Sequence, residues 1–470
     1  MEAQENKDKE SFRDSIATID KSGKRVWMFP SQPKGKYYNY RKYLSYVYLF
    51  VFFGLPFIKA NGNPLFLINI LERKFILFGV IFWPQDFFVF GIGMITFIVF
   101  IALFTVIYGR VFCGWACPQT IFMELIFRRI EYWIDGDSAY QRKLKDAPWN
   151  SDKIIKRFSK YALFLLVSFL IANNFLAYII GKDELFNMIN SPINENKGTF
   201  ISLLIFTSVF FFVYSWFREQ VCLIVCPYGR MQGVLLDPNS IVVAYDYVRG
   251  ENRHKFKKNE VRTGGDCIDC GLCVKVCPTG IDIRNGTQLE CVNCTACMDA
   301  CDNIMDGVGM EKGLIRLASE NDIRNKQRLT FTKRMLAYSI VLILLLGLET
   351  YLLISRSDYD ATIIRAKGML YQERENNEIS NLFTIKLMNK TYDSLPVRFK
   401  VKEFPDARIE WIGKNLYTKP GDMTQGEFFV YVKQNQIKTR KTKLNIELYS
   451  NNKIIKTAKT TFLAPVKSKK

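Results

Sequence analysis

The chain of 470 residues contains a single histidine, His254, which lies in the polar stretch ENRHKFKKNE. A b-type haem held between membrane helices needs axial histidine ligands, and no apolar segment of this chain offers one. The sequence also lacks C-x-x-C-H, the attachment motif of c-type haem. Haem-based electron transfer is therefore excluded, and His254 is expected to be a solvated loop residue.

Cysteine is missing from both ends of the chain, because all twelve cysteines lie between Cys113 and Cys301.

The N-terminal stretch MEAQENKDKESFRDSIATIDKSG lacks the basic, apolar and cleavage regions of a signal peptide. The first apolar span is therefore expected to serve as the membrane-insertion signal.

Charge is unbalanced, with 65 Lys and Arg against 45 Asp and Glu and a formal net charge of +20. In a soluble protein this excess would suggest a nucleic-acid partner. Here 49% of the residues are hydrophobic, and they are concentrated in long runs that basic loops flank. We therefore expect membrane lipid, and no nucleic acid, as a partner.

Five stretches are predicted to span a membrane, the first being short and ending at Pro56: 43–58, 87–108, 161–180, 199–217 and 335–354. Lysine and arginine number ten in residues 1–42 and nine in 109–157, but three in 59–86 and two in 181–198. Since basic loops stay in the cytoplasm, the N-terminus is predicted to be cytoplasmic, and five spans place the C-terminus outside. The predicted location is the inner (cytoplasmic) membrane of a bacterium.

The predicted fold class is a polytopic α-helical membrane protein with a cytoplasmic ferredoxin-type domain and a C-terminal all-β domain. The predicted parts are a cytoplasmic N-terminal segment (1–42), a four-helix membrane region (43–217), a cytoplasmic segment (218–334) with a ferredoxin-type domain at about 258–305, a fifth transmembrane helix (335–354) and a periplasmic domain (356–470). From about Ser380 the tail alternates apolar and polar β-formers, which predicts an immunoglobulin-like sandwich of about seven strands without a disulfide. Every cysteine then lies on the reducing side, so thiolates are expected.

The strongest motif is C-x-x-C-x-x-C-x-x-x-C, which occurs twice between Cys267 and Cys301. Three cysteines at this spacing can each reach a different iron of a cubane, and the fourth is usually donated to the other cluster. The spacing therefore predicts two [4Fe–4S] clusters of the bacterial ferredoxin type. The expected ligands are Cys267, Cys270, Cys273 and Cys301 for one cluster, and Cys291, Cys294, Cys297 and Cys277 for the second.

Zinc is the competing metal for this motif. Structural zinc sites separate two C-x-x-C knuckles by a longer loop, and a third cysteine this close does not suit a tetrahedral site. Iron–sulfur clusters are favoured, and two of them held this close would conduct electrons.

A second motif, C-x-x-x-C-P, follows two of the predicted spans, in RVFCGWACPQT and in CLIVCPYGRMQ. Pro118 disfavours a helical conformation at Cys117, so the second span is expected to stop there. Cys113 and Cys117 are expected on one face of the last turn of that span, and Cys222 and Cys226 likewise. If the two hairpins pack together, these four residues, here called the edge thiols, converge at one depth at the cytoplasmic edge of the membrane.

Several roles are open to the edge thiols. Thiolates without histidine or carboxylate partners select Cu(I), zinc or iron–sulfur species. Met123 and Met231 follow the two motifs and could add thioether ligands, although packing is the commoner role. Buried cysteine can also act as a small hydrophobe, but the repeated spacing favours a metal or redox role.

These motifs together resemble the cytochrome c oxidase accessory protein family called CcoG, FixG or RdxA. The resemblance covers most of the chain, including KRVWMFPSQPKGKYYNYR, FWPQDFF, both C-x-x-x-C-P segments, the twin ferredoxin motif and the β-domain. It implies a role in maturing cbb3-type cytochrome oxidase, with reduction of Cu(II) to Cu(I) as the activity and the edge thiols Cys113, Cys117, Cys222 and Cys226 as catalytic, copper-binding residues. A cytoplasmic electron donor and oxidase subunits or copper chaperones would be the partners, and a homodimer stays open.

Two other functions compete with cupric reduction. A quinol-linked carrier similar to the polyferredoxin subunits of periplasmic reductases would show cluster reduction by quinol and no copper dependence. A non-enzymatic assembly scaffold would depend on the β-domain, so deleting 380–470 would abolish function and leave copper reduction intact.

Overall fold

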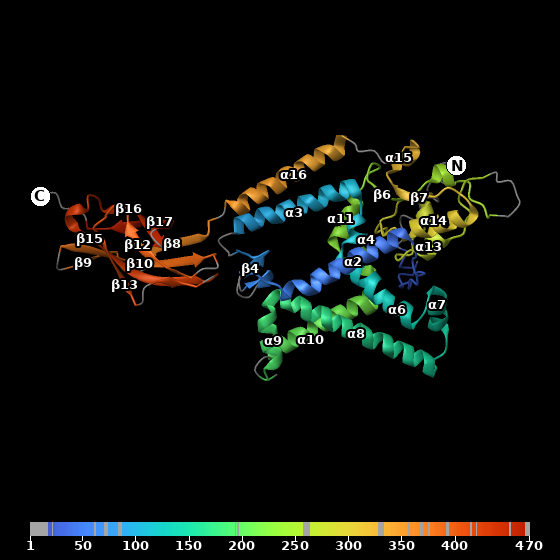
Figure 1. The fold of residues 1–470 in the computed structure, drawn as a ribbon, viewed down its shortest axis with the longest axis horizontal. Coiled ribbons are helices and arrows are strands. Elements are labelled where there is room, and N and C mark those ends of the chain that lie inside the picture. Colours follow the sequence, from blue (N-terminus) through green and yellow to red (C-terminus); the bar gives the residue numbers. More distant parts are fainter. Residues whose placement is uncertain are drawn as a thin grey trace. The chain divides into compact units, whose positions relative to one another are not determined.

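The computed structural model describes residues 17–465, apart from 21, 61–62, 70–73, 83–86, 193, 195–196, 257–263, 328–332, 356, 367, 369, 375–376, 392–393, 414–415, 420 and 451–452. Residues 1–16 of the predicted N-terminal segment, the predicted start of the ferredoxin-type domain at 258–263 and the last five residues of the β-domain thus lie outside the described residues. The chain forms two compact units (Figure 1), each described by itself below. The first comprises Met1–Ile58 and Phe90–Glu349, and the second Lys59–Val89 and Thr350–Lys470.

The first unit is helical. Its longer helices are α2 (Lys36–Gly54), α3 (Phe87–Tyr108), α8 (Ser151–Ile180), α10 (Lys197–Phe212) and α16 (Lys333–Ile354). Its shorter helices are α4 (Val111–Trp115), α5 (Pro118–Phe122), α6 (Arg128–Ile134), α7 (Ser138–Asp146), α9 (Lys182–Asn190), α11 (Pro227–Leu235), α12 (Tyr247–Gly250), α13 (Leu272–Lys275), α14 (Ala296–Val308) and α15 (Glu320–Arg324). Short 3-10 turns lie at Leu55–Phe57 and Ile283–Asn285, and π-helical turns at Met123–Phe127, Val213–Phe217 and Val221–Val225.

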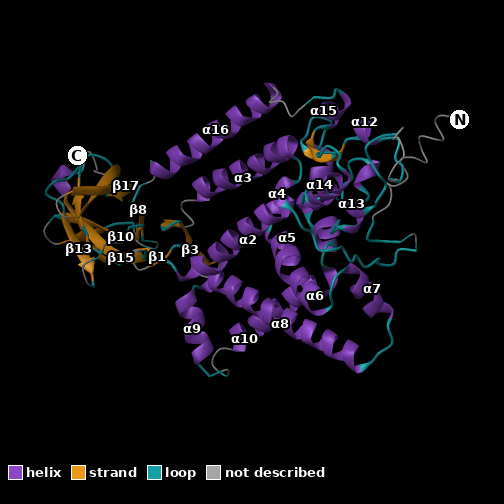
Figure 2. Ribbon diagram, turned by 45° about the vertical axis from the view of Figure 1, so that its right-hand side comes forward, coloured by secondary structure: helices purple, strands orange, loops and turns teal. Residues whose placement is uncertain are grey.

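Four helices in the described part of the chain are long and apolar enough to cross a membrane: Phe88–Tyr108, Ser151–Ile180, Lys197–Phe217 and Met335–Ile354. They correspond to four of the five predicted spans, and the protein is membrane-associated through them. The two views show α3 beside α16 and α8 beside α10 (Figures 1 and 2). The predicted span 43–58 falls on α2, which is not among the four because its first half, KYYNYRKY, is polar. That span stays a prediction.

The chain after the second predicted span corrects one expectation. Helix α3 ends at Tyr108, because Gly109 adopts a left-handed conformation with φ +54°. Cys113 therefore lies in the separate short helix α4, and Cys117 is extended with ψ 126°. The spacing alone predicts that the two cysteines share the last turn of the span. The structure shows that they do not. Pro118 does begin a new helix, α5, as expected from its missing N–H.

Two strands outside the predicted ferredoxin-type range of about 258–305 pack on it. Strand β6 (Val242–Tyr245) pairs antiparallel with β7 (Ile315–Ala318), with Val242 opposite Ala318. Both strands pack on the cysteine loops, since Val243, Tyr245 and Ile315 belong to one buried cluster with Cys267 and Cys273. The N-terminal segment also reaches this domain, because the Asp299 carboxylate of α14 accepts the backbone N–H groups of Tyr37 and Tyr38 in the first turn of α2.

The second unit contains the β-domain. One sheet has the order β13 (Arg408–Ile412), β15 (Met423–Lys433), β10 (Glu378–Asn389), β8 (Tyr359–Arg365), with β9 (Gln372–Arg374) also on β10; the other has β12 (Arg398–Val401), β16 (Lys441–Ser450) and β17 (Lys453–Leu463). A short pair, β11 (Leu395–Pro396) and β14 (Tyr417–Thr418), and a 3-10 turn at Gln434–Gln436 complete it. Alternate residues such as Phe383, Phe428 and Ile446 fill the core and are fully buried. This is the predicted immunoglobulin-like sandwich.

Residues 59–82 also belong to this unit. They form the pair β1 (Lys59–Ala60) and β2 (Asn63–Pro64) and a three-stranded sheet, β3 (Phe66–Asn69), β4 (Lys74–Leu77) and β5 (Val80–Phe82). Phe78 and Gly79, both at positive φ, form the two-residue turn between β4 and β5. The sequence predicts this segment only as a loop between two spans, because its strands are short.

Candidate iron–sulfur and edge-thiol site

The eight ferredoxin-motif cysteines line two cavities of about 350 Å³ each, including the part open to solvent. The cavity here called A is lined by Cys267, Cys270, Cys273 and Cys301, and the cavity here called B by Cys277, Cys291, Cys294 and Cys297. Cys273 also touches the wall of cavity B. The fourth cysteine of each motif thus crosses to the cavity of the other motif. These groups are the same as the ligand sets predicted from spacing, and as ligand sets they stay predictions.

The donor set of each cavity fits a cubane cluster. Among the described residues no three ligating side chains are close enough together to hold one metal ion. A cubane does not require this, since each of its four thiolates binds a different iron. Burial raises the pKa of the Cys273, Cys291 and Cys301 thiols to about 12, so cluster binding must displace their protons.

Apolar side chains close both cavities against water. Ile281 and Ile283 line cavity B, and Ile268 lines cavity A. Strands β6 and β7, which the sequence does not predict to contribute, also form the walls: Val243 lines cavity B, and Tyr245 and Ile315 line cavity A. The apolar runs IVVAY (241–245) and LIRLA (314–318) are the sequence signal that could have predicted these two buried strands.

The edge thiols occupy two turns of similar construction. In the first, the backbone N–H of Cys117 donates to the Phe112 carbonyl, and Cys117 is extended before Pro118. In the second, the N–H of Cys226 donates to the Val221 carbonyl, and Cys226 is extended, with ψ 113°, before the proline that begins α11. Each motif thus places its first cysteine in a short helical turn and its second at the N-terminus of a new helix.

The two cysteine pairs lie near each other, although no three of these four thiols are close enough together to hold one metal ion in this structure. Burial, and after it the proximity of the Cys117, Cys113 and Cys226 thiols, raises the pKa of Cys222 to about 12. Burial also raises the pKa of Cys117, and the Cys226 thiol adds to the effect. Close packing holds the second turn, because a Cβ on Gly229 would lie 2.3 Å from the Cys222 carbonyl oxygen.

The two methionines near the motifs differ in position. Met123 is buried and lines a small cavity, here called the edge pocket, together with Cys222. Met231 is 41% exposed on α11 and is not part of that wall. A thioether contribution is therefore open to Met123 alone of the two.

The edge pocket shares a wall with cavity B. Pro278, Thr279 and Val292 line both. Cys113 belongs to one buried apolar cluster with Val292 and Cys294. A Cβ on Gly114 would lie 2.4 Å from the Val292 carbonyl oxygen, so α4 contacts the loop of cavity B backbone to backbone. One layer of residues thus separates the edge thiols from the second predicted cluster.

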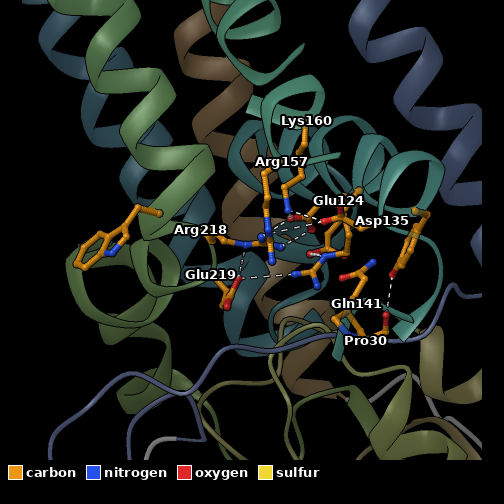
Figure 3. Close-up of polar contacts among 12 residues, drawn as sticks. Pro30, Glu124, Asp135, Gln141, Arg157, Lys160, Arg218 and Glu219 are labelled. Atoms are coloured by element: carbon orange, nitrogen blue, oxygen red, sulfur yellow. Dashed lines mark hydrogen bonds and ion pairs between the residues drawn. The ribbon is translucent and has the colours of Figure 1, made fainter. Parts of the chain in front are cut away.

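A buried network of charged residues lies behind the second motif (Figure 3). Arg218 donates to both carboxylate oxygens of Glu131, at 2.6 and 2.8 Å. The shorter of the other ion pairs are Lys160 with Asp135 (2.5 Å), Arg128 with Glu124 (3.0 Å), and Arg218, Arg25 and Arg128 with Glu219 (3.5, 3.5 and 3.6 Å). The Glu219 carbonyl accepts the N–H of Cys222, so the network positions the turn that carries this thiol.

Arg110 is a positive charge between the edge thiols and cavity B. Its side chain is 3% exposed, and it donates to the Leu289 carbonyl. It opposes the effect of burial by lowering the pKa of both Cys222 and Cys291. Arg110 therefore stabilises negative charge on either side of the shared wall.

We predict that Arg110→Gln lowers the reduction potential of the cluster in cavity B by an amount on the order of tens of millivolts, because reduction adds negative charge that the guanidinium no longer stabilises. Redox titration followed by electron paramagnetic resonance measures the shift. The matched control is Arg230→Gln, because Arg230 is exposed on α11 and its charge is screened by water. An equal shift in both variants would contradict the role of Arg110.

Three family models match the chain. One described as "4Fe-4S binding domain" matches residues 90–144, and one described as "4Fe-4S dicluster domain" matches 217–320. The third, an "IG-like fold at C-terminal of FixG", matches 350–465. The second unit therefore carries the immunoglobulin-like domain, and the chain is an iron–sulfur protein of the ferredoxin type.

Similar curated proteins cover most of the chain. The nitrogen fixation protein FixG of Rhizobium meliloti is 30% identical over 83% of this chain and 82% of its own. Protein RdxA and protein RdxB of Cereibacter sphaeroides are 32% and 31% identical over 80% and 87% of this chain and 82% and 89% of their own. A solved FixG-related protein of Vibrio parahaemolyticus covers 24% of this chain and all of its own at 20% identity, but its TM-score of 0.21 is too low to carry an argument. With about 30% identity over at least four-fifths of each curated relative, the chain belongs to the FixG/RdxA family of membrane-associated iron–sulfur electron-transfer proteins.

Proposed function

We propose that this protein reduces Cu(II) to Cu(I) at the edge thiols, with electrons that a cytoplasmic donor supplies through cavities A and B. The clusters, when bound, supply one-electron transfer. Each turnover moves one electron to one Cu(II) ion, and the Cu(I) product serves the assembly of a cbb3-type cytochrome oxidase, as the family resemblance implies. The observation that carries the proposal is the shared wall of Pro278, Thr279 and Val292 between cavity B and the edge pocket.

The chemistry of the edge thiols supports copper as the substrate. Thiolates, with the Met123 thioether nearby, are soft ligands that stabilise Cu(I) over Cu(II) and so favour reduction. The site is partly buried, which limits the access of water and dioxygen to the product. Cys113 is in contact with the loop of cavity B, and this makes it the expected entry point of the electron.

A second occupant is favoured by a specific observation. The family model for a 4Fe-4S binding domain covers 90–144, and the cysteines of that segment are Cys113 and Cys117. A cubane takes four thiolates, and Cys222 and Cys226 would complete the set. The edge thiols would then hold a third cluster, and the protein would be a three-cluster carrier, for instance one that accepts electrons from quinol.

We predict that Cys226→Ser slows copper reduction by about tenfold or more and leaves the clusters of cavities A and B intact, because it removes one copper ligand. Purified protein is reduced chemically without oxygen and mixed with Cu(II) and a Cu(I)-specific chelator, whose absorbance gives the rate. Ile224→Val, a conservative change in the same turn, is the matched control and should keep the wild-type rate.

Iron analysis separates the two occupants. A copper site predicts about eight irons per chain in both the wild type and a variant with all four edge thiols replaced by serine. A third cluster predicts about twelve irons in the wild type and about eight in that variant. An unchanged rate of copper reduction in Cys226→Ser would contradict the copper assignment. A deletion of 380–470 that abolishes oxidase assembly while copper reduction persists would instead favour the non-enzymatic assembly scaffold.

A further inference from the structure

A cavity of about 390 Å³, here called cavity C, lies at the N-terminal end of α8 and is not used by the electron path. Its volume is in the range of ligand sites. Five cationic side chains line it: Lys145, Lys153, Arg157, Lys160 and Arg218. Aromatic rings, among them Trp27, Trp149, Tyr161 and Phe164, form much of the remaining wall.

The positive charge of cavity C exceeds its internal compensation. Glu131 is the one carboxylate among its lining residues, and it already accepts two hydrogen bonds from Arg218. Asp135, just behind the wall, is engaged by Lys160 at 2.5 Å and lies 3.8 Å from Arg157. Arg218 also pairs with Glu219 at 3.5 Å, a carboxylate that it shares with Arg25 and Arg128. Three carboxylates therefore face three cations at this wall, and Lys145 and Lys153 add positive charge beyond them.

Lys153 is the least compensated of these cations. Its side chain is 5% exposed, and its ammonium donates to the backbone carbonyls of Lys145, at 3.0 Å, and Ala147. It lies 5.1 Å from the centre of the Trp149 ring. In the described part of the chain no carboxylate lies within ion-pair distance of it. A buried ammonium with only neutral partners indicates an anion as its missing partner.

The position of cavity C along α8 indicates the depth of a lipid headgroup. The helix has 30 residues, about ten more than the hydrocarbon core of a bilayer requires. Its apolar run begins near Tyr161, so Lys153 and Arg157 precede the hydrocarbon segment. Phe158 is 75% exposed, and Trp149 equally so, as is typical of aromatic side chains at a membrane interface.

We propose that cavity C binds the phosphate of an anionic phospholipid headgroup. Lys153, Arg157 and Lys160 are spaced i, i+4 and i+7 on α8 and present their cations along one face, where a phosphodiester can accept several charge-assisted hydrogen bonds. Tyr161 and Phe164 continue the wall toward the membrane and fit the first carbons of an acyl chain. Free phosphate shares the headgroup's charge but lacks this apolar contact.

Lipid-depleted protein in an uncharged detergent provides the first test. We expect a short-chain phosphatidylglycerol to raise the apparent melting temperature and to remain bound in native mass spectra. A short-chain phosphatidylcholine and inorganic phosphate at equal concentration should do neither. The proposal would be overturned if phosphatidylcholine raised the melting temperature as much as phosphatidylglycerol does, or if inorganic phosphate did so. It would also be overturned if native mass spectra showed a bound anionic aromatic molecule instead of lipid.

Paired variants locate the site. Lys153→Gln combined with Arg157→Gln should weaken phosphatidylglycerol binding by about tenfold or more, because two charge-assisted contacts are lost. Lys156→Gln removes one positive charge on the outer face of α8, where Lys156 pairs with Asp152, and is the control for Arg157→Gln alone; it should leave binding unchanged. The iron content of each variant verifies that it is folded. If the double variant does not fold, the phosphatidylglycerol affinity of Arg157→Gln alone and the comparison of lipids on the wild type still test the proposal. Equal affinity in all variants would place the lipid elsewhere.

Discussion

Cys277→Ser is expected to remove the cluster of cavity B, although Cys277 belongs to the first of the two sequence motifs. The reason is that Cys277 lines cavity B with Cys291, Cys294 and Cys297. Cys301→Ser is expected to remove the cluster of cavity A in the same way. Each variant should fall from about eight irons per chain to about four, since a cubane that loses one thiolate ligand is poorly retained.

Reference variants make this crossing testable. The paramagnetic resonance spectrum of reduced Cys277→Ser should match that of Cys291→Ser, and the spectrum of Cys301→Ser should match that of Cys267→Ser. If each fourth cysteine instead served its own motif, the two spectra would be exchanged. Copper reduction gives a second readout: both variants should lose it, because both interrupt the path from the cytoplasmic donor to the shared wall.

The cysteine groups could be predicted from the sequence because their information is local. Spacings of three and four residues determine which thiolates can surround one cubane, whatever the rest of the chain does. The β-domain was predictable for a similar reason, since alternation of apolar residues specifies a half-buried strand without knowledge of its partner.

The surroundings of the site could not be predicted because they depend on contacts distant in sequence. Glu131 and Arg218 are 87 residues apart, and Asp299 caps α2 across 262 residues. A charged residue in a basic loop has no local signature that distinguishes a buried partner from a solvated one. The end of α3 is different, because the predicted span 87–108 has the same bounds as the helix and Gly109 in YGRV is a local signal that separates it from Cys113.

The predicted convergence of the edge thiols depended on both kinds of information. The repeated C-x-x-x-C-P spacing predicted the extended residue before each proline, and this is what Cys117 and Cys226 show. It did not predict that Gly114 permits the backbone contact of α4 with the loop of cavity B, or that Gly229 permits the close packing within the second turn. Nor did it predict Arg110, whose role depends on the folded position of Leu289.

Glu131→Gln is expected to destabilise the first unit by about 3–5 kcal/mol, because it removes the carboxylate that accepts two hydrogen bonds from the buried Arg218 and leaves only the longer contact with Glu219 at 3.5 Å. Glu131 and Arg218 are each 4% exposed, so water cannot replace the lost interaction. The apparent melting temperature should fall by an amount on the order of 10 °C. Asp152→Asn is the matched control: its ion pair with Lys156 is exposed, and its loss should cost less than about 1 kcal/mol.

The same substitution should disturb the edge thiols. Arg218 adopts a positive φ of 52°, a conformation that costs a non-glycine residue about 1–3 kcal/mol and that its ion pairs with Glu131 and Glu219 help to maintain. The next residue, Glu219, accepts the N–H of Cys222 through its carbonyl. Glu131→Gln should therefore slow copper reduction while iron content stays at the wild-type level, a combination that general unfolding would not produce.

The pH dependence of this effect follows from the ionisation of Glu131. Burial alone would raise its pKa, but the charge and hydrogen bonds of Arg218 outweigh burial and lower it from 4.5 to about 2. The stabilisation by the carboxylate is thus complete above pH 4.5 and is lost only as the pH falls toward 2. The difference in melting temperature between wild type and Glu131→Gln should accordingly be the same at pH 6 and pH 8. A difference that shrinks between these values would show that another group, titrating near neutrality, carries the interaction with Arg218.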